Sequence, residues 1–77
     1  MVYPNPAKEA LHINMDDGDY TRLSMSDVNG KQMKTVNLPA NVKEFKIDTY
    51  NYPPGYYIIY LDGVLGRIVK TFVKVSD

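Results

Sequence analysis

The residues that decide the fold are Tyr52-Pro53-Pro54-Gly55-Tyr56-Tyr57-Ile58-Ile59-Tyr60-Leu61, which contain the one place where apolar residues run without interruption. Pro-Gly precedes this run and Asp62-Gly63 follows it, so turn residues bound it on both sides. A bounded run of Ile, Tyr and Leu is typical of a strand covered on both faces. We therefore predict that it is the central strand of the domain.

Strand alternation divides this run into two sets of side chains. Successive side chains of a strand point to opposite faces, and in a sandwich only one face of a sheet meets the core. The sets are Tyr57, Ile59 and Leu61 on one face and Tyr56, Ile58 and Tyr60 on the other. If the fold is a sandwich, one set forms a partly exposed apolar face that a partner or a parent protein could cover.

Length and composition bound the class of protein. The 77 residues are near the lower limit at which a hydrophobic core holds a fold alone. With no cysteine, neither a disulfide framework nor a thiolate metal site is available. Nine basic and nine acidic side chains cancel, which argues against a nucleic-acid partner. The longest apolar run is far shorter than a membrane span of about 20 residues, so no membrane insertion is expected.

Six further segments have the composition or the alternation of strands. The first, Val2-Tyr3-Pro4-Asn5-Pro6, is kept extended by its prolines and is expected to be an edge strand or a turn. The others span residues 10–15, 20–26, 31–38, 42–49 and 67–75. In 31–38 the spacing changes between Met33 and Val36, which indicates a bulge.

The alternation also predicts which side chains of these strands face the core. Inward positions are Leu11, Ile13, Met15, Leu23, Met25, Phe45 and Ile47, and the apolar positions of 31–38 are Met33, Val36 and Leu38. Outward positions include His12, Asn14, Arg22, Ser24 and Ser26. The last strand carries Val69, Thr71, Val73 and Val75 on one face and Ile68 and Phe72 on the other.

Turn signals separate the strands. Asp16-Asp17-Gly18-Asp19 predicts a hairpin, because Asp and Gly both tolerate positive φ, and it lacks the ligand set of an EF-hand calcium loop. Asp27-Val28-Asn29-Gly30 predicts a second hairpin, and Asp62-Gly63-Val64-Leu65-Gly66 a third. No window has a helical period. The prediction is a small all-β, immunoglobulin-like sandwich of about seven mostly antiparallel strands, connected largely as a meander.

No set of residues is equipped for catalysis. His12 is the only histidine, and neither a cysteine nucleophile nor a second strong metal ligand accompanies it. Acid–base catalysis by carboxylates needs two of them in a cleft, for which so small a domain has little room. We therefore expect no enzymatic activity, no cofactor and no metal site, and we expect His12 to be a surface residue.

Tyrosines are the most unusual feature of the composition. Five of the seven lie between Tyr50 and Tyr60. One interpretation is that they fill and rim a core that has no cysteine. The other is a surface patch from Tyr56 and Tyr60, which share a strand face with Ile58, as in a carbohydrate-binding or adhesive module.

Four blocks of sequence, taken in order, resemble a known family. They are Val2-Tyr3-Pro4-Asn5-Pro6-Ala7, then Asp27-Val28-Asn29-Gly30-Lys31, then Ile47-Asp48 followed by Gly55-Tyr56-Tyr57, and finally Thr71-Phe72-Val73-Lys74. Together they resemble the type A C-terminal sorting domain of the Bacteroidetes type IX secretion system. The chain departs from the family pattern at Thr49, at Tyr52 and in the residues 75–77 after the last block.

The resemblance implies a role in export. Residues 1–77 would form a single sorting domain at the C-terminus of a larger secreted precursor. A Sec signal peptide would bring the precursor into the periplasm, and the outer-membrane translocon would recognise this domain. A sortase-like peptidase would then cut upstream and join the cargo to an anionic lipopolysaccharide at the cell surface. The family fold is a seven-stranded immunoglobulin-like sandwich.

By the same resemblance, the motif residues are candidates for recognition by the translocon or the peptidase. They are Tyr3, Pro4, Asn5, Pro6, Asp27, Gly30, Gly55, Tyr57, Lys70, Phe72, Val73 and Lys74. We predict that the last strand, 67–74, is read through its backbone edge, while Lys70 and Lys74 discourage indiscriminate pairing. The alternative is that these residues only build turns and edges.

Overall fold

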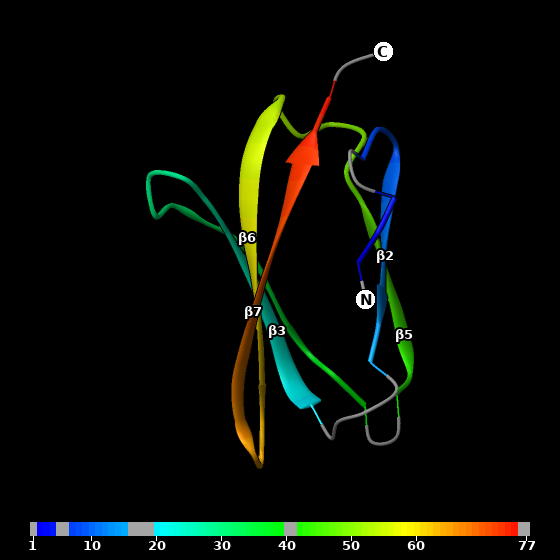
Figure 1. Cartoon of the computed structure of the whole chain (residues 1–77), viewed down its shortest axis with the longest axis vertical. Helices are drawn as coiled ribbons and strands as arrows, with labels where there is room; N and C mark the ends of the chain where they lie inside the picture. Colours follow the sequence, from blue (N-terminus) through cyan, green and yellow to red (C-terminus); the bar gives the residue numbers. More distant parts are fainter. Residues whose placement is uncertain (1, 5–6, 16–19, 40–41, 76–77) are drawn as a thin grey trace.

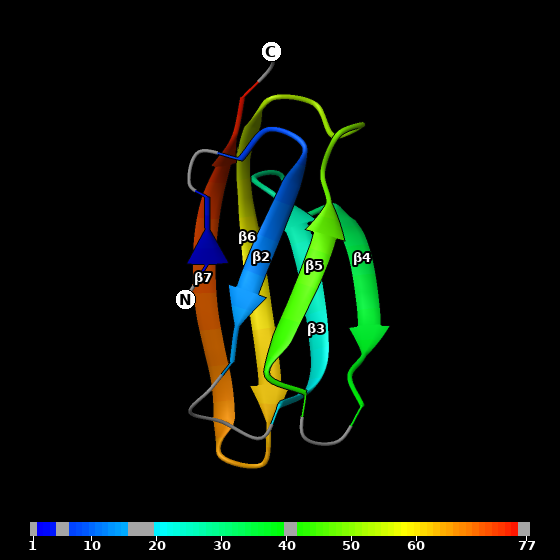
Figure 2. The same ribbon diagram turned by 90° about the vertical axis from the view of Figure 1, so that its right-hand side faces the viewer.

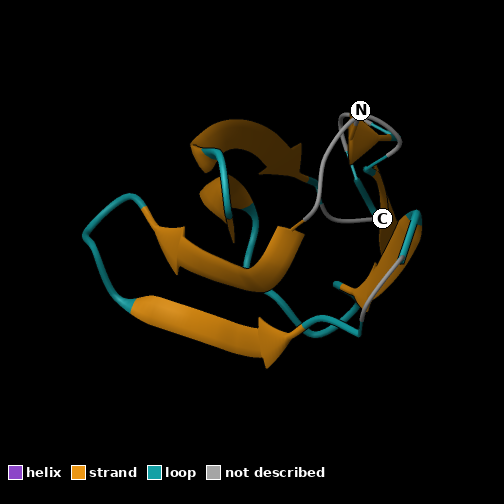
Figure 3. Cartoon of the chain, turned by 90° about the horizontal axis from the view of Figure 1, so that it is seen from below, coloured by secondary structure: helices purple, strands orange, loops and turns teal. Residues whose placement is uncertain are grey.

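The computed structural model describes residues 2–4, 7–15, 20–39 and 42–75, and these form strands joined by loops, with no helix among them (Figure 3). The strands are β1 (Val2–Tyr3), β2 (Ala10–Asn14), β3 (Tyr20–Asp27), β4 (Gln32–Asn37), β5 (Glu44–Asp48), β6 (Gly55–Gly63) and β7 (Gly66–Lys74). The predicted all-β class and the count of seven strands are confirmed.

The strands form two antiparallel sheets that face each other (Figures 1 and 2). One sheet has the order β1-β2-β5 and the other the order β4-β3-β6-β7. The first, second and fifth strands thus share a sheet, which is an immunoglobulin-like arrangement of a sandwich. The predicted fold class is confirmed.

The predicted meander is wrong at its first turn. The Asp-Gly signal predicts that β2 and β3 pair as a hairpin, but β2 pairs with β1 and β5, and β3 pairs with β4 and β6. The chain therefore crosses from one sheet to the other between these strands, and the turn residues 16–19 lie outside the described residues. Opposite sheets allow the apolar faces of β2 and β3 to pack against each other, which a hairpin within one sheet does not.

The other two predicted hairpins are present. Asp27–Lys31 joins β3 to β4, and β6 turns into β7 with Gly63 paired to Gly66. In β4 the register shifts opposite Met25 and Ser26 and leaves Met33 without a partner residue, so the predicted bulge exists and lies at Met33. The first segment was predicted to be an edge strand or a turn. It forms an edge strand, in which Val2 lies opposite Ile13.

The core lies between the two sheets and follows the predicted inward faces. All of the predicted inward residues of β2 and β3 are buried, Ile47 is buried, and Phe45 is half-buried against the core. Among the apolar positions of 31–38, Leu38 is buried, while Met33 and Val36 are half-buried. The buried residues are Ala7, Leu11, Ile13, Met15, Leu23, Met25, Leu38, Ile47, Tyr57, Ile59, Leu61 and Phe72.

β6 is a central strand, as predicted, with β3 on one side and β7 on the other. Tyr57, Ile59 and Leu61 face the core and are buried. The opposite face is not covered: Tyr56 is 64% exposed, and Ile58 and Tyr60 are half-buried. The first interpretation, a strand covered on both faces, is therefore wrong, because only one side of this sheet has another sheet against it.

Candidate recognition site

Residues from three of the four sequence blocks meet at one end of the four-stranded sheet. Asp27 of β3 lies opposite Tyr57 of β6, and Tyr57 lies opposite Phe72 of β7. Gly55 lies opposite Lys74 in the same hairpin. Residues far apart in the sequence therefore form adjacent rows at the end where β6 begins and β7 ends (upper end in Figure 1). We call this region the motif end.

Aromatic packing holds the motif end together. The rings of Tyr57 and Phe72 stack at 5.3 Å between centroids, and Tyr52 packs on Tyr57 at 5.6 Å. The Tyr57 hydroxyl donates a 2.5 Å hydrogen bond to the carbonyl of Pro53, which fixes the loop before β6. Burial, followed by the nearby carboxylate of Asp27, raises the pKa of Tyr57. Tyr57 is thus a neutral structural anchor.

The two motif glycines are required by backbone conformation rather than by space. Gly55 has a φ of +149° and Gly30 a φ of +84°, and a Cβ atom added at either position would meet nothing within 4 Å. Residues with side chains rarely adopt these φ values. These glycines therefore shape the entry to β6 and the β3–β4 turn.

Asp27 builds the turn in which Gly30 lies. One of its carboxylate oxygens accepts hydrogen bonds from the backbone N–H groups of Asn29 and Lys31, each at 2.9 Å. Its own carbonyl accepts the N–H of Gly30 at 3.1 Å. These contacts give Asp27 a local role in the β3–β4 hairpin.

The motif residues of β7 divide into buried and exposed positions. Phe72 is 1% exposed and Lys74 is 5% exposed, so their side chains lie inside the sandwich. The Lys74 ammonium group donates a 3.2 Å hydrogen bond to the carbonyl of Val75. Val73 is half-buried, and Lys70 is exposed. Of the two lysines predicted to guard the strand, only Lys70 is open to an approaching partner.

The start of the first sequence block, Val2 and Tyr3, lies on the other sheet. Tyr3 stacks on His12 at 5.3 Å between ring centroids and donates a 3.3 Å hydrogen bond to Glu44. The Glu44 carboxylate raises the pKa of Tyr3. Pro4 is exposed, and Asn5 and Pro6 lie outside the described residues. His12 is half-buried under Tyr3, which the sequence gives no means of foreseeing because the two residues belong to separate strands.

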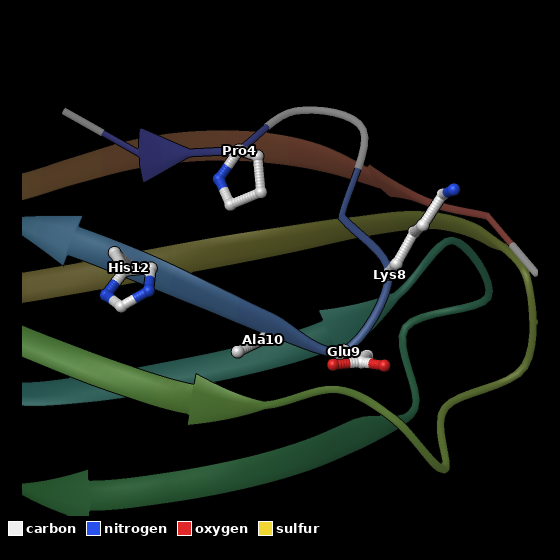
Figure 4. Close-up of a pocket in the computed structure, with 5 residues that line it drawn as sticks. All are labelled: Pro4, Lys8, Glu9, Ala10 and His12. Atoms are coloured by element: carbon white, nitrogen blue, oxygen red, sulfur yellow. The ribbon is translucent and has the colours of Figure 1, made fainter. Parts of the chain in front are cut away.

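A shallow hollow of about 460 Å³ lies beside this block. Figure 4 shows Pro4 above it, His12 at one end and Lys8 and Glu9 at the other, with the small side chain of Ala10 between them. Within the described ranges, no three His, Cys, Asp or Glu side chains come together as metal ligands. The hollow offers a ring, a cation and an anion, but no catalytic pair.

Ala7 lies at the edge of the second sheet, and in the sequence it stands only as the end of the first block, without a predicted role. Its N–H donates to the carbonyl of Val73 at 2.7 Å, and its carbonyl accepts the N–H of Val75 at 2.9 Å. These two bonds form a parallel bridge on the outer side of β7, which we call the Ala7 clamp. Ala7 is completely buried, so a small side chain here lets the backbones approach.

The clamp reveals which backbone groups of β7 lie on its open edge. Because the Val73 carbonyl and the Val75 N–H point to Ala7, they point away from β6. Successive residues of a strand alternate in the side to which their backbone groups point. Arg67, Val69 and Thr71 therefore direct their N–H and C=O groups to the same outer edge. No strand of the described part of the chain pairs with that edge at these positions.

The predicted tyrosine patch lies on the outward face of the four-stranded sheet. Tyr56 and Tyr60 share that face, but the Arg67 guanidinium lies 4.8 Å from the centroid of the Tyr60 ring. Asp62 holds Arg67 through hydrogen bonds of 2.6 and 3.2 Å, and Arg67 lowers the pKa of Asp62. The cation thus occupies one face of Tyr60, so Tyr56 is the more accessible ring.

The arrangement defines a β-sandwich whose shared motif residues serve as packing and turn anchors around an open strand edge. In the described ranges, no helix is long and apolar enough to cross a membrane.

The chain belongs to the family of secretion system C-terminal sorting domains, whose family model matches residues 1–75. Domains of this family are cargo tags of type IX secretion rather than catalysts, and they direct export toward the outer membrane, the cell surface or the medium. No curated protein and no solved structure matches the chain.

Proposed function

We propose that the type IX translocon reads this domain by adding a strand to the open edge of β7. The observation that carries the proposal is the row of backbone groups at Arg67, Val69 and Thr71, which no strand of the described residues pairs with and which ends at the Ala7 clamp. An exposed strand edge is a ready template for an extended partner segment. The clamp covers the C-terminal part of the edge and so limits the partner to the part before Val73.

The side chains along this edge suit a selective partner. Lys70 projects from one face of β7, and a charged side chain on an edge discourages pairing with arbitrary strands. Val69 and Thr71 project from the other face and are exposed, and they lie opposite Tyr60 and Ile58 of β6. A partner strand would therefore gain both backbone hydrogen bonds and contact with an apolar face.

In this proposal the buried motif residues act indirectly. Tyr57, Phe72 and Gly55 hold β6 and β7 in register at the motif end, and Asp27 holds the neighbouring hairpin. Their replacement would disturb the edge by loosening the sheet. The predicted recognition roles of Tyr57, Phe72 and Lys74 become positioning roles, because a partner cannot reach these side chains in the folded domain.

Processing completes the proposed function. Residues 1–77 would be the C-terminal domain of a longer precursor that passes through the periplasm. A sortase-like peptidase would cut upstream of Val2 and attach the cargo to the cell surface. In support, β1 is only two residues long, lies at the edge of its sheet and carries the exposed Tyr3.

The test is a reporter with a Sec signal, fused upstream of this domain and expressed in a bacterium with type IX secretion. Deletion of residues 69–77 would also remove Phe72 from the core, so point variants are needed. Val69→Pro removes an edge-facing N–H without breaking a bond to β6, and Val69→Ala is the matched control that keeps the N–H. Thr71→Pro is a second variant of the same kind.

We expect the proline variants to unfold near the temperature of the unmodified domain but to reduce surface delivery at least several-fold. Val69→Ala is expected to be delivered normally. The mass of the surface-exposed reporter then reports whether the domain was removed. Full delivery of folded Val69→Pro and Thr71→Pro would rule out strand addition at this edge, while loss of cleavage alone would separate processing from translocation.

A further inference from the structure

A second hollow lies over β3, on the face of the four-stranded sheet turned away from β2 and β5. In Figure 1 this face of the sheet is the left-hand one. It has a volume of about 260 Å³, close to the lower end of small-molecule pockets. Its polar lining comes from β3, β4, β6 and β7. Its polar lining residues include Arg22, Ser24, Ser26, Gln32, Tyr60 and Arg67.

Two serine side chains form the floor of this hollow. Ser24 and Ser26 occupy alternate positions on the outward face of β3, as the sequence predicts, yet each is only 8% exposed. The reason is that they are short and lie between longer neighbours: Ser24 is opposite Thr35 on one side and Tyr60 on the other. The floor is therefore polar and recessed.

The hydroxyls of Ser24 and Ser26 have no hydrogen-bond partner within the described ranges. Buried hydroxyls in folded proteins nearly always have one. No fully enclosed side-chain oxygen or nitrogen of the described residues lacks a partner, so the two serine oxygens are not sealed in but open to the hollow. Two adjacent hydroxyls, recessed and unpaired, are suited to a ligand that both donates and accepts hydrogen bonds.

The walls of the hollow are held in place by their own contacts. On one side, Arg67 lies over the Tyr60 ring and is fixed by Asp62. On the other side, the Gln32 amide is hydrogen-bonded to Thr35. Side chains that are already fixed lose less conformational entropy when a ligand binds, which favours recognition of a small ligand.

The charges of the hollow favour an anionic group. Arg22 lies opposite Asp62 across the strands, and Arg67 is bonded to it, so two guanidinium groups are near one carboxylate and both lower its pKa. Asp62 forms an ion pair with Arg67, so its negative charge is balanced by that guanidinium group. The positive charge of the exposed Arg22 is then not neutralised by this pair. A ligand carboxylate beside Arg22 would meet a positive field, while its hydroxyls would reach the serine floor.

We propose that this hollow binds one acidic monosaccharide unit, a hexuronate, with its hydroxyls on Ser24 and Ser26 and its carboxylate toward Arg22. The proposal does not depend on recognition at the β7 edge. It also differs from the tyrosine patch suggested by the sequence, because Tyr56 lies outside the hollow.

The test is an NMR titration of the 77-residue chain with glucuronate, methyl glucoside and sulfate, followed in backbone amide spectra. We expect glucuronate to shift the resonances of Ser24, Ser26 and Tyr60 and to bind at least several-fold more tightly than methyl glucoside. Ser24→Ala with Ser26→Ala should abolish the shifts, and Arg22→Gln should remove the preference for glucuronate. Tyr56→Ala, on the same sheet face but outside the hollow, is the matched control and should bind normally.

Three results would overturn the proposal. They are an absence of shifts at the hollow with either sugar, saccharide shifts centred on Tyr56, and shifts by sulfate without shifts by glucuronate, which would mean an adventitious anion. Because serine and alanine differ by one oxygen atom, and neither serine hydroxyl bonds to a described residue, the double variant is expected to keep the fold. If its spectrum is not that of a folded chain, Arg22→Gln and the ratio between the two sugars still decide the outcome, since Arg22 is exposed.

Discussion

The two ends of the β6–β7 hairpin both carry large apolar side chains, but these are buried at one end and exposed at the other. At the motif end, Tyr57 and Phe72 are stacked and buried. At the turn end, Val64 is 83% exposed and Leu65 is 96% exposed. The comparison teaches that the family motif marks the packed end, whereas the most exposed apolar residues lie outside the motif. The buried motif residues of this chain therefore stabilise the fold in the first place.

The largest difference between the two ends should appear on truncating one apolar side chain at each. We expect Phe72→Ala to lower the free energy of unfolding by about 3–5 kcal/mol, because it empties a fully buried aromatic site. Leu65→Ala, at the exposed turn, is expected to change it by less than about 0.5 kcal/mol. Urea denaturation measures both. Equal effects of the two substitutions would contradict the packing described at the motif end.

A smaller contrast separates two glycines of the hairpin, one at each end of β6, although Gly66 at the turn end also has a positive φ. Gly55 adopts a positive φ, so Gly55→Ala should cost about 1–3 kcal/mol through strain. Gly63, at the turn end, is not among the glycines with positive φ, and Gly63→Ala is the control with a smaller expected effect. Chemical denaturation of the two variants side by side tests this. A neutral Gly55→Ala would mean that the loop before β6 adapts to a side chain.

The smallest effect concerns the ion pair at the turn end. Arg67 lowers the pKa of the Asp62 carboxyl below its ordinary value of 3.8, so the pair stabilises the fold above that value. The stabilisation is lost as the pH falls from 3.8 through the lowered pKa. Since the Arg67 side chain is exposed and that of Asp62 is only half-buried, we expect only a slight drop in the unfolding temperature there. Arg67→Gln should abolish that part of the pH dependence, and an unchanged profile would exclude it.

Alternation along single strands carried most of the fold prediction. Leu11, Ile13, Leu23 and Met25 face the core as expected, because a half-buried strand needs period-two patterning. The turn residues between the strands correctly predicted the β3–β4 and β6–β7 hairpins, because a tight turn also depends on residues that are close in sequence. The sheet to which β2 belongs could not be obtained in this way, since pairing across the sandwich depends on contacts distant in sequence.

The site was less accessible to sequence reasoning. The motif blocks identified the strands that form the candidate site. The burial of Lys74 and the stacking of Tyr3 on His12 could not be predicted, because they depend on tertiary packing. Ser24 and Ser26 were placed on the correct face, but their recess between longer neighbours needs the cross-strand register. Ala7 belongs to the first block of the family pattern, but its role could not be predicted, because a lone alanine after prolines has no periodic pattern.

The Ala7 clamp also has a mechanical consequence. Ala7 runs parallel to the end of β7, so a pull on the first residues of the chain against its last residues draws the two segments in opposite directions along one line. Their two hydrogen bonds would then be loaded in shear and would have to break together rather than one after the other. A domain towed by its own chain ends through a transport machine would meet its greatest resistance to unravelling at this point.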